Sequence, residues 1–254
     1  MKNQEYKKKN NHIVNKILTS ILALLITSTS INAQFSNKKI KGNGNIITTD
    51  RSVTDFDKIG IAGSFDVILN KGNEGAISIQ ADENLMEYII TEVKNGNLKI
   101  KSKKGYQLKS AKTIQITVGF NDLKEVSLAG SGDVTTSDAI DASDLKLSLA
   151  GSGDMNLKVS TKHLTSKIAG SGNISLNGST DEFSCSIAGS GNLNGYELKA
   201  TVAKAKIAGS GNIKVNAVSE IHASIAGSGN VYYSGNPEVE KSNSAGSGSL
   251  KKKS

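Results

Sequence analysis

Through the second half of the chain, apolar and polar residues alternate in runs that recur about every 20 residues. Each run surrounds an Ala-Gly-Ser-Gly motif. The motif occurs seven times, with its alanine at Ala129, Ala150, Ala169, Ala188, Ala208, Ala226 and Ala245. The successive intervals are 21, 19, 19, 20, 18 and 19 residues. A period near 20 residues that tolerates small insertions predicts a solenoid in which each repeat forms one coil.

Counted from the motif alanine, the neighbouring positions alternate between apolar and polar side chains. In the first six copies the residue before the alanine is Leu or Ile, and the residue five positions after it is also apolar, as Ile168 and Ile174 are around Ala169. The intervening positions are polar, for example Lys167. A period of two predicts a strand that buries one face. Coils stacked about 4.8 Å apart join such faces into one narrow core.

The motif itself predicts a corner of each coil. Its two glycines fall on inward positions, whereas its alanine, its serine and the following Asn or Asp fall on outward positions. Glycine at such places indicates backbone with positive φ, or backbone too close to the opposite wall for a side chain.

Stacked corners also predict a flat outer surface, which we call the surface ribbon. Its columns repeat at the spacing of the coils, so it is a candidate for binding a repetitive ligand or another copy of the protein. The candidate binding residues are the serine and the Asn or Asp of six copies: Ser131, Asp133, Ser152, Asp154, Ser171, Asn173, Ser190, Asn192, Ser210, Asn212, Ser228 and Asn230.

An alternative interpretation of the ribbon is a polysaccharide-degrading enzyme. Asp133 and Asp154 share one outward column in adjacent coils, which places their carboxyls near the roughly 5 to 5.5 Å separation of retaining glycosidases. The next four copies carry asparagine there, a pattern typical of a turn-capping ladder that accepts either residue. No arginine cluster stands nearby to bind a uronate. We therefore assign no catalytic residue.

Residues 46–125 predict a less regular β region that closes the N-terminal end of the solenoid core. The motif is absent for 67 residues between Ala62 and Ala129, although strand-like runs persist, such as residues 65–69 and 114–118. Weaker copies of the motif begin at Lys41 and at Ala62, 21 residues apart, so the repeat is expected to begin near residue 41. Within this region Asp82 begins the one predicted helix, which has a short apolar stripe containing Leu85 and Ile89.

The first 33 residues predict a secretory signal peptide. Five lysines precede an apolar run over residues 17–26, and small residues lead to Ala33. The run is shorter than the roughly 20 residues needed to span a bilayer, so it predicts a cleaved leader and no remaining membrane span. We expect secretion across the inner membrane, to the periplasm, the cell surface or the medium.

The predicted parts are the signal peptide (1–33), an N-terminal segment (34–45), the repeat domain (46–250, with the irregular region 46–125 and the solenoid 126–250) and a basic tail (251–254).

Composition narrows the function classes. Without residues 1–33 the formal net charge falls from +8 to +4, and Arg51 is the only arginine. Scattered lysines interleaved with acids do not form the basic, aromatic surface of a nucleic-acid-binding protein. Cys185 is the single cysteine, so no disulfide forms within the chain, and its inward position predicts a buried, inert thiol. His163 and His222 lie far apart on different coils, so neither a metal site nor a cofactor is expected.

The last motif copy predicts a polar end coil, because its inward positions are Ser244, Ser242 and Glu240. Terminal repeats face water instead of another coil, so this loss of the apolar pattern favours a solenoid that ends here. The lysines of residues 251–253 are expected to form a solvated tail, and contact with anionic lipid or polysaccharide is the weaker alternative.

Several stretches resemble the head GIN domain family of auto-transporter adhesins. They are residues 56–69 (FDKIGIAGSFDVIL), 82–85 (DENL), 97–100 (NLKI) and the serial AGSG copies, and they extend over roughly residues 46–249. The resemblance implies a secreted bacterial protein with an all-β, right-handed parallel β-helix-like fold and an adhesive function. It supplies no catalytic or ligand-binding residues.

Two function classes follow from these patterns. The first is a binding module of the cell envelope or surface that engages polysaccharide, a cell-surface ligand or its own copies along the ribbon. The second is a structural or assembly role in the envelope without a ligand beyond neighbouring proteins. A polysaccharide-degrading enzyme is the third and weakest alternative.

Overall fold

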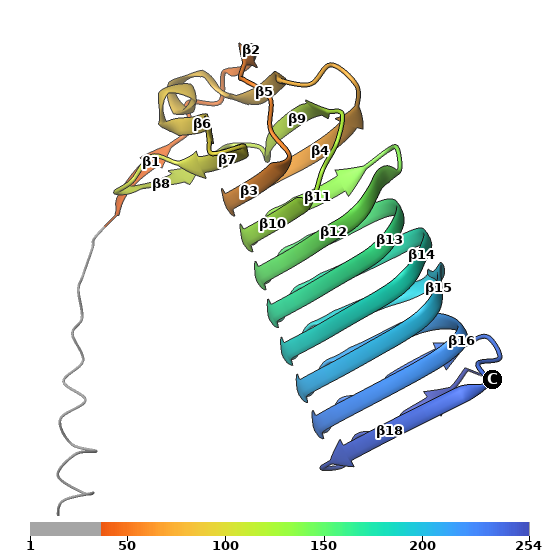
Figure 1. Ribbon diagram of the computed structural model, residues 1–254. Helices are drawn as coiled ribbons and strands as arrows, with labels where there is room; N and C mark the ends of the chain where they lie inside the picture. Colours follow the sequence, from red (N-terminus) through yellow and green to blue (C-terminus); the bar gives the residue numbers. More distant parts are fainter. Residues whose placement is uncertain (1–36, 254) are drawn as a thin grey trace, which may run out of the picture. The chain divides into compact units, whose positions relative to one another are not determined.

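The protein is a β-solenoid with a small cap at its N-terminal end. The computed structural model describes residues 37–253. The solenoid and its cap together form one compact unit (Figure 1). Strands account for 73% of the structure and helix for 3%, and about seven turns of roughly 19-residue coils make up the solenoid. The predicted fold class is confirmed. The predicted signal peptide, residues 1–33, lies outside the described residues.

The coils stack through parallel strands in register. The motif alanines pair from one coil to the next, from Ala129 with Ala150 through to Ala226 with Ala245. The strands are β10 (Glu125–Gly130), β11 (Asp133–Thr136), β12 (Ile140–Gly151), β13 (Asp154–Gly170), β14 (Asn173–Gly189), β15 (Asn192–Gly209), β16 (Asn212–Gly227), β17 (Val231–Ser234), β18 (Val239–Ala245) and β19 (Leu250–Lys252).

The solenoid core consists of the inward columns predicted from the alternation. Ile168 and Ile174, on either side of one corner, are buried, as are their counterparts in neighbouring coils. Burial of each such side chain contributes about 1.5 to 3 kcal/mol. The column three positions before the motif alanine begins with Val126 and Leu147 and then changes to small residues, among which Cys185 lies between Ser166 and Ala205. One continuous apolar core therefore runs through the coils as far as β17.

The irregular β region is present, but its coils do not stack in sequence order. β3 (Lys58–Gly63) and β4 (Phe65–Lys71) form the first coil with a motif, and Ala62 pairs directly with Ala129. The 67-residue interval between these alanines therefore separates adjacent coils. The chain leaves after β4, builds the cap and returns at β10.

The cap is made by strands of that interval together with the preceding residues. β7 (Asn97–Ser102) and β9 (Ile114–Phe120) pair with β3 and β4 on the side away from the repeats, which extends the core by one irregular coil (Figure 1). Antiparallel pairs β2–β5, β5–β9 and β6–β7 and the parallel pair β1–β8 complete it. Their bounds are β1 (Lys38–Lys41), β2 (Ile46–Ser52), β5 (Ala76–Asp82), β6 (Ile89–Lys94) and β8 (Tyr106–Lys109).

The prediction that the repeat begins at Lys41 is wrong. Lys101 of β7, not Lys41, pairs with Ala62. The glycine-rich loop after Lys41 instead wraps around the buried carboxylate of Asp82, which accepts a hydrogen bond from the backbone N–H of Gly44 at 2.6 Å. A Cβ atom on Gly42 would lie 2.3 Å from Cγ of Asp82. These glycines allow the backbone to approach a carboxylate closely. Their spacing in the sequence nevertheless resembles that of a corner motif.

The helix predicted from Asp82 is shorter and tighter than expected. It is the 3₁₀-helix η1 (Glu83–Tyr88), and Ile89 already begins β6. The guanidinium of Arg51 donates hydrogen bonds to the carbonyl oxygens of Met86 (2.9 Å) and Ile89 (2.6 Å). It thus satisfies carbonyls that the end of a short helix leaves open. Partial burial lowers the pKa of Arg51.

The C-terminal coil is polar, as predicted. Glu240, Ser242 and Ser244 of β18 are all exposed. Charged and polar side chains on an edge strand oppose pairing with another chain. Lys251 and Lys252 of the predicted basic tail lie in β19, so their backbone belongs to this last coil.

Candidate binding surface

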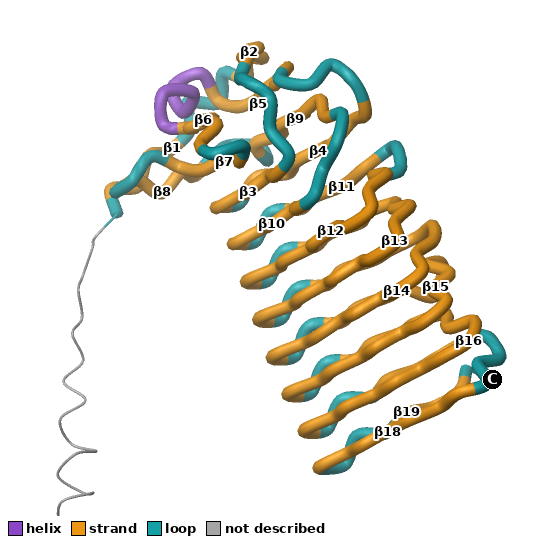
Figure 2. The backbone as a smooth tube through the Cα atoms, viewed as in Figure 1, coloured by secondary structure: helices purple, strands orange, loops and turns teal. Residues whose placement is uncertain are grey.

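Each motif forms a sharp corner whose backbone contacts the corner of the preceding coil. Gly170 has φ of 127°, and a Cβ atom on it would lie 2.4 Å from the carbonyl oxygen of Gly151. A Cβ atom on Gly172 would lie 2.2 Å from the carbonyl oxygen of Gly153. The corner therefore needs positive φ, as predicted, but the close neighbour is the adjacent coil and not the opposite wall. Figure 2 shows these corners as short loops stacked along one edge.

The backbone of the corner is closed by hydrogen bonds between coils. The N–H groups of Ser171 and Gly172 both donate to the carbonyl oxygen of Gly151, at 2.9 and 3.0 Å. In the corners from Ser152 to Gly229, two N–H groups likewise share the carbonyl oxygen of the corresponding glycine in the preceding coil. Because these backbone groups are satisfied internally, the outer surface of the corner consists of side chains.

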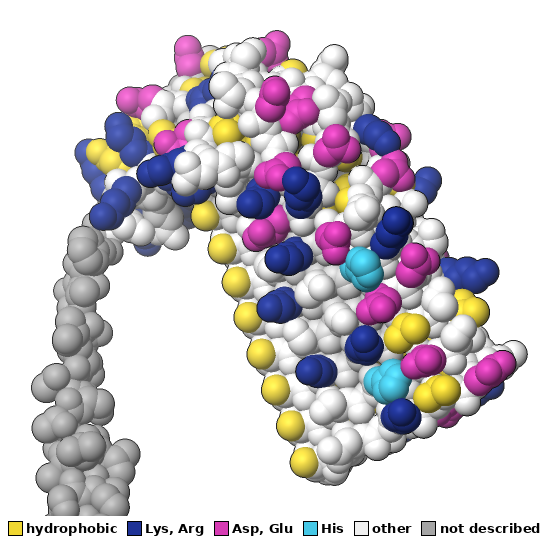
Figure 3. Space-filling model, in the orientation of Figure 1, with side chains coloured by type: hydrophobic (Ala, Val, Ile, Leu, Met, Phe, Trp, Pro, Cys, Tyr) yellow, Lys and Arg dark blue, Asp and Glu magenta, His cyan; other side chains and the backbone are white. Residues whose placement is uncertain are grey.

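Two columns of small side chains follow the corners. The ribbon serines are exposed, and so are the motif alanines beside them. The alanines form an unbroken file from Ala62 to Ala245, since each pairs with the alanine of the next coil. A file of apolar side chains along one edge of the coils is visible in Figure 3.

The third ribbon column, made of Asp and Asn side chains, is a hydrogen-bonded ladder. Asn192 Oδ1 accepts from both the backbone N–H and Nδ2 of Asn212, each at 3.2 Å. Asn192 Nδ2 in turn donates to Asn173 Oδ1 at 3.1 Å. The ladder extends from Asp66, in the coil adjacent to that of Asp133, to Ser249, whose N–H and hydroxyl donate to the side chain of Asn230. Each side chain caps the next coil instead of its own turn.

The two ribbon aspartates of the enzyme alternative belong to this ladder. Asp133 Oδ1 accepts the backbone N–H of Asp154 at 3.2 Å, and Asp133 in turn donates its N–H to Asp66 at 3.3 Å. Burial raises the pKa of Asp66. The carboxylates of Asp133 and Asp154 hold coils together and are exposed, so the geometry gives them a structural role.

The remaining sequence candidates lie apart from the ribbon. Cys185 is buried, and burial raises the pKa of its thiol, which fits the predicted inert role. His163 is exposed beside Asp144 (3.1 Å), and His222 is half-buried beside Glu220 (3.0 Å). Within residues 37–253 there is no group of three or more His, Cys, Asp or Glu side chains placed to hold a metal ion.

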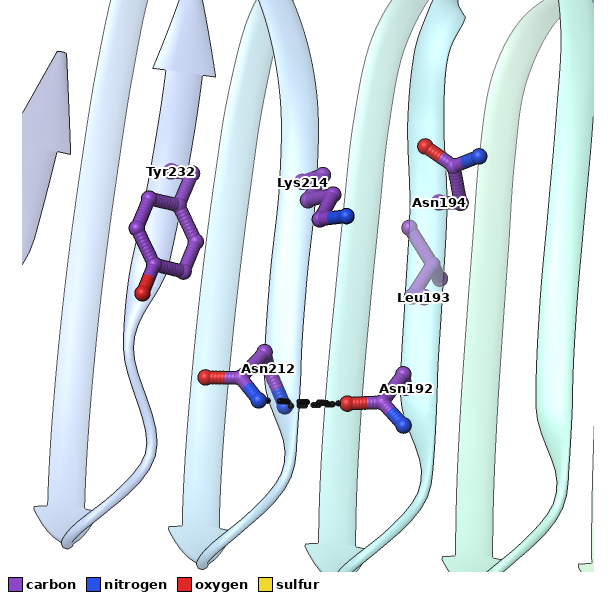
Figure 4. Close-up of a pocket in the computed structure, with 6 residues that line it drawn as sticks. All are labelled: Asn192, Leu193, Asn194, Asn212, Lys214 and Tyr232. Carbon is purple, nitrogen blue, oxygen red and sulfur yellow. Dashed lines mark hydrogen bonds between the residues drawn. The ribbon is translucent and has the colours of Figure 1, made fainter. Parts of the chain in front are cut away.

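A shallow depression beside the ribbon was not anticipated from the sequence. Its volume is about 580 Å³, and it opens on the strands that follow the corners (Figure 4). Outward positions of adjacent strands provide Asn194, Lys214 and Tyr232, which pair across β15, β16 and β17. The ladder residues Asn192 and Asn212 and the strand at Leu193, whose side chain is buried in the core, complete the lining. The sequence does contain a signal for this depression. When the motif copies are aligned, the outward position six residues after the alanine changes from Asn194 to Lys214 and then to Tyr232.

Fold and corner geometry together define a parallel β-solenoid built on AGSG corners. The family described as "Putative auto-transporter adhesin, head GIN domain" matches residues 55–237. The chain belongs to this family. The resemblance seen in the sequence is thereby confirmed.

Solved structures share the fold. A "putative adhesin" from Bacteroides fragilis superposes with a TM-score of 0.79 at 24% identity, and the match covers 84% of this chain and all of that one. A "putative lipid binding protein" from Parabacteroides distasonis has a TM-score of 0.72 at 33% identity, over 85% of this chain and all of that one. A "putative adhesin" from Parabacteroides merdae has a TM-score of 0.69 at 24% identity, again over 85% and 100%. No curated protein matches the chain.

Proposed function

We propose that the protein is an adhesive binding module of the bacterial cell envelope or surface, which holds polysaccharide or another cell-surface ligand along the surface ribbon. The observation that carries the proposal is the ribbon's construction. Its corner backbone is satisfied internally, and its serine hydroxyls and alanine methyls are exposed at the regular spacing of the coils. Such a surface suits an extended, repeating ligand better than a small substrate.

The family and two of the similar structures are described as adhesins, which supports this class of function. Export is part of the proposal and rests on the signal peptide predicted over residues 1–33. Within residues 37–253, no helix has the length and apolar character required to cross a bilayer.

Lipid binding, named for the relative from Parabacteroides distasonis, has less support in this chain. Val218 is the one large hydrophobic side chain exposed among the described residues. Insertion into a lipid surface requires a cluster of such side chains.

The test is retention of the purified protein on immobilised polysaccharides and envelope fractions, with released sugar measured in the same wells. The triple variant Ser152→Glu, Ser190→Glu, Ser228→Glu places three bulky negative charges on the ribbon and is expected to abolish retention. A matched control, Ser148→Glu, Ser186→Glu, Ser224→Glu, adds the same charges to the same coils on the preceding strands. Equal retention of both variants contradicts a role for the ribbon, and release of sugar supports the enzyme alternative.

Absence of any retention favours the envelope structural role. In that case the oligomeric state of the unaltered protein, measured by analytical ultracentrifugation, distinguishes self-association from assembly with other proteins. A concentration-dependent dimer that the ribbon variant lacks assigns the ribbon to contact between copies.

A further inference from the structure

Two tyrosines and three lysines cluster beside the depression, carried by β15, β16, β17, β19 and the residue that follows β19. The coil from Ala188 to Ala208 has 20 residues, one more than the coil before it, and the pairing of β15 shifts register around Tyr196. A β-bulge redirects side chains at the point where it occurs. The ring of Tyr196 thereby lies beside Lys214, the outward residue next to Tyr232. Burial, and to a smaller extent the nearby Tyr232, raises the pKa of Tyr196.

Lysine ammonium groups lie over both rings. Lys253 Nζ is 4.5 Å from the centroid of Tyr196, and Lys214 Nζ is 5.9 Å from the same centroid. Lys251 Nζ lies 5.8 Å from the centroid of Tyr232. These are cation–π distances. We call this cluster of Tyr196, Lys214, Tyr232, Lys251 and Lys253 the tyrosine-lysine patch.

The charge of the patch is not neutralised by the protein. None of the three lysines forms an ion pair within residues 37–253, and all three are exposed. No acidic side chain lines the adjoining depression, whose polar groups include the amide of Asn194. The patch therefore presents positive charge, aromatic surface and amide groups together.

We propose that the tyrosine-lysine patch is a binding site for acidic polysaccharide, with the lysines pairing with uronate carboxylates and the tyrosines contacting the apolar faces of sugar rings. This inference rests on the proposed adhesive function and names its ligand class. Tyrosine combines an apolar ring with a polar tip, which suits a sugar. Adjacent strands lie about 4.8 Å apart, a spacing comparable to the length of one pyranose unit, so successive sugars meet equivalent positions on successive coils.

Other anionic partners fit the patch less well. A lipid surface offers headgroup charge, but the described residues expose no apolar cluster beside the lysines that would enter the acyl region. A nucleic acid requires a longer basic track, commonly with arginine, and the single arginine of the chain is engaged in the cap.

The test compares binding of the unaltered protein to polygalacturonate, to neutral dextran and to phosphatidylglycerol vesicles. Binding to polygalacturonate is expected, with an affinity that falls as salt is raised. The variant Lys214→Gln, Lys251→Gln, Lys253→Gln is expected to bind about tenfold more weakly, as is Tyr196→Ser combined with Tyr232→Ser. The control Lys146→Gln, Lys167→Gln, Lys206→Gln removes the same charge from strands before the corners and is expected to bind normally.

Unchanged binding by both patch variants overturns the inference, and so does equal weakening by the control. Preference for dextran or for vesicles over polygalacturonate overturns the ligand class. If the patch variants bind normally while the ribbon variant with glutamates at positions 152, 190 and 228 does not, the proposed function stands without this site. If the unaltered protein is retained on no polysaccharide or envelope fraction, both proposals fail. Circular dichroism of every variant confirms that it is folded.

Discussion

Asp154 Oδ1 accepts two hydrogen bonds from Asn173, one coil further along: the backbone N–H donates at 3.1 Å and the side-chain Nδ2 at 2.9 Å. The contact connects residues 19 positions apart in sequence, and the same geometry recurs up the ladder. Side chains of one column thus hold the coils in register. In the sequence, the Asn and Asp column looks like a ligand-binding feature. In the structure, its side-chain oxygens accept hydrogen bonds from the next coil.

Replacing a ladder side chain should therefore destabilise the solenoid. Asn192→Ala removes the acceptor for the N–H and Nδ2 of Asn212, and we expect a loss of about 1 to 3 kcal/mol in the free energy of unfolding. Urea titration followed by circular dichroism measures it. Asn156→Ala, at an exposed outward position off the ladder, is the control and should change stability by less than about 0.5 kcal/mol. Similar losses in both variants contradict a stabilising ladder.

A carboxylate and an amide should be interchangeable where only the acceptor oxygen is used. Within the described residues, the side chain of Asp133 accepts a hydrogen bond only from the backbone N–H of Asp154. The free energy of unfolding of Asp133→Asn should therefore lie within about 0.5 kcal/mol of that of the unaltered protein. The same variant should lose activity if Asp133 acted as a catalytic carboxylate. Sugar release that disappears in Asp133→Asn therefore rejects the purely structural role.

The corner glycines should tolerate no side chain. Gly170→Ala places a Cβ atom 2.4 Å from the Gly151 carbonyl oxygen at a φ of 127°. Backbone strain of about 1 to 3 kcal/mol adds to an overpacking cost of similar size, so we expect a strongly lowered melting temperature. Ala169→Ser, next to it on the exposed face, should melt within a few degrees of the unaltered protein. Equal melting of Gly170→Ala and the unaltered protein shows that the corner can open.

The periodicity predicts most of the solenoid because each coil repeats the same local physics. Alternation around Ala169 identifies which side chains are buried, and the glycines identify the corner. The order of the first coils is not local in this sense. Ala62 and Ala129 are neighbours only because a long insertion leaves and re-enters the stack, and no residue pattern encodes that return.

The candidate site is predicted less completely for a related reason. The outward ribbon columns follow from register, so their exposure could be foreseen. The use of Asp and Asn oxygens on the next coil depends on the distance between coils. The tyrosine-lysine patch depends on a register shift of β15 near Tyr196 and on lysines from other coils that lie over its ring. Both arise from contacts between residues about 20 or more positions apart, which single-strand patterns do not report.

The buried hydroxyl of Ser166 should be a weak point of the core. Ser166 is fully buried in an inward column, and its Oγ has no hydrogen-bond partner within the described residues. An unsatisfied buried polar group costs about 1 to 3 kcal/mol, so Ser166→Ala should raise the free energy of unfolding by about 1 kcal/mol. Thermal and urea unfolding check this. The exposed Ser160→Ala is the control, and a loss of stability in Ser166→Ala indicates that the hydroxyl is bonded in solution.

The cap should unfold in acid through Asp82. Its carboxylate is buried and accepts hydrogen bonds from the Ser110 hydroxyl, from the Ala111 N–H at 3.0 Å and from the Gly44 N–H, and these bonds, the one from Ser110 first, hold its pKa below the ordinary value of 3.8. A lowered pKa in the folded state means that the ionised form stabilises the fold. That contribution is complete above the unfolded pKa and is lost as pH falls through the lower folded pKa.

Between pH 6 and about pH 3 the unaltered protein should therefore lose more stability than Asp82→Asn, which should be less stable at pH 6. Urea unfolding at several pH values compares the two, with Asp50→Asn, an exposed carboxylate of β2, as the control. Parallel pH profiles for the Asp82 variant and the unaltered protein rule out this carboxylate as the source of the acid sensitivity.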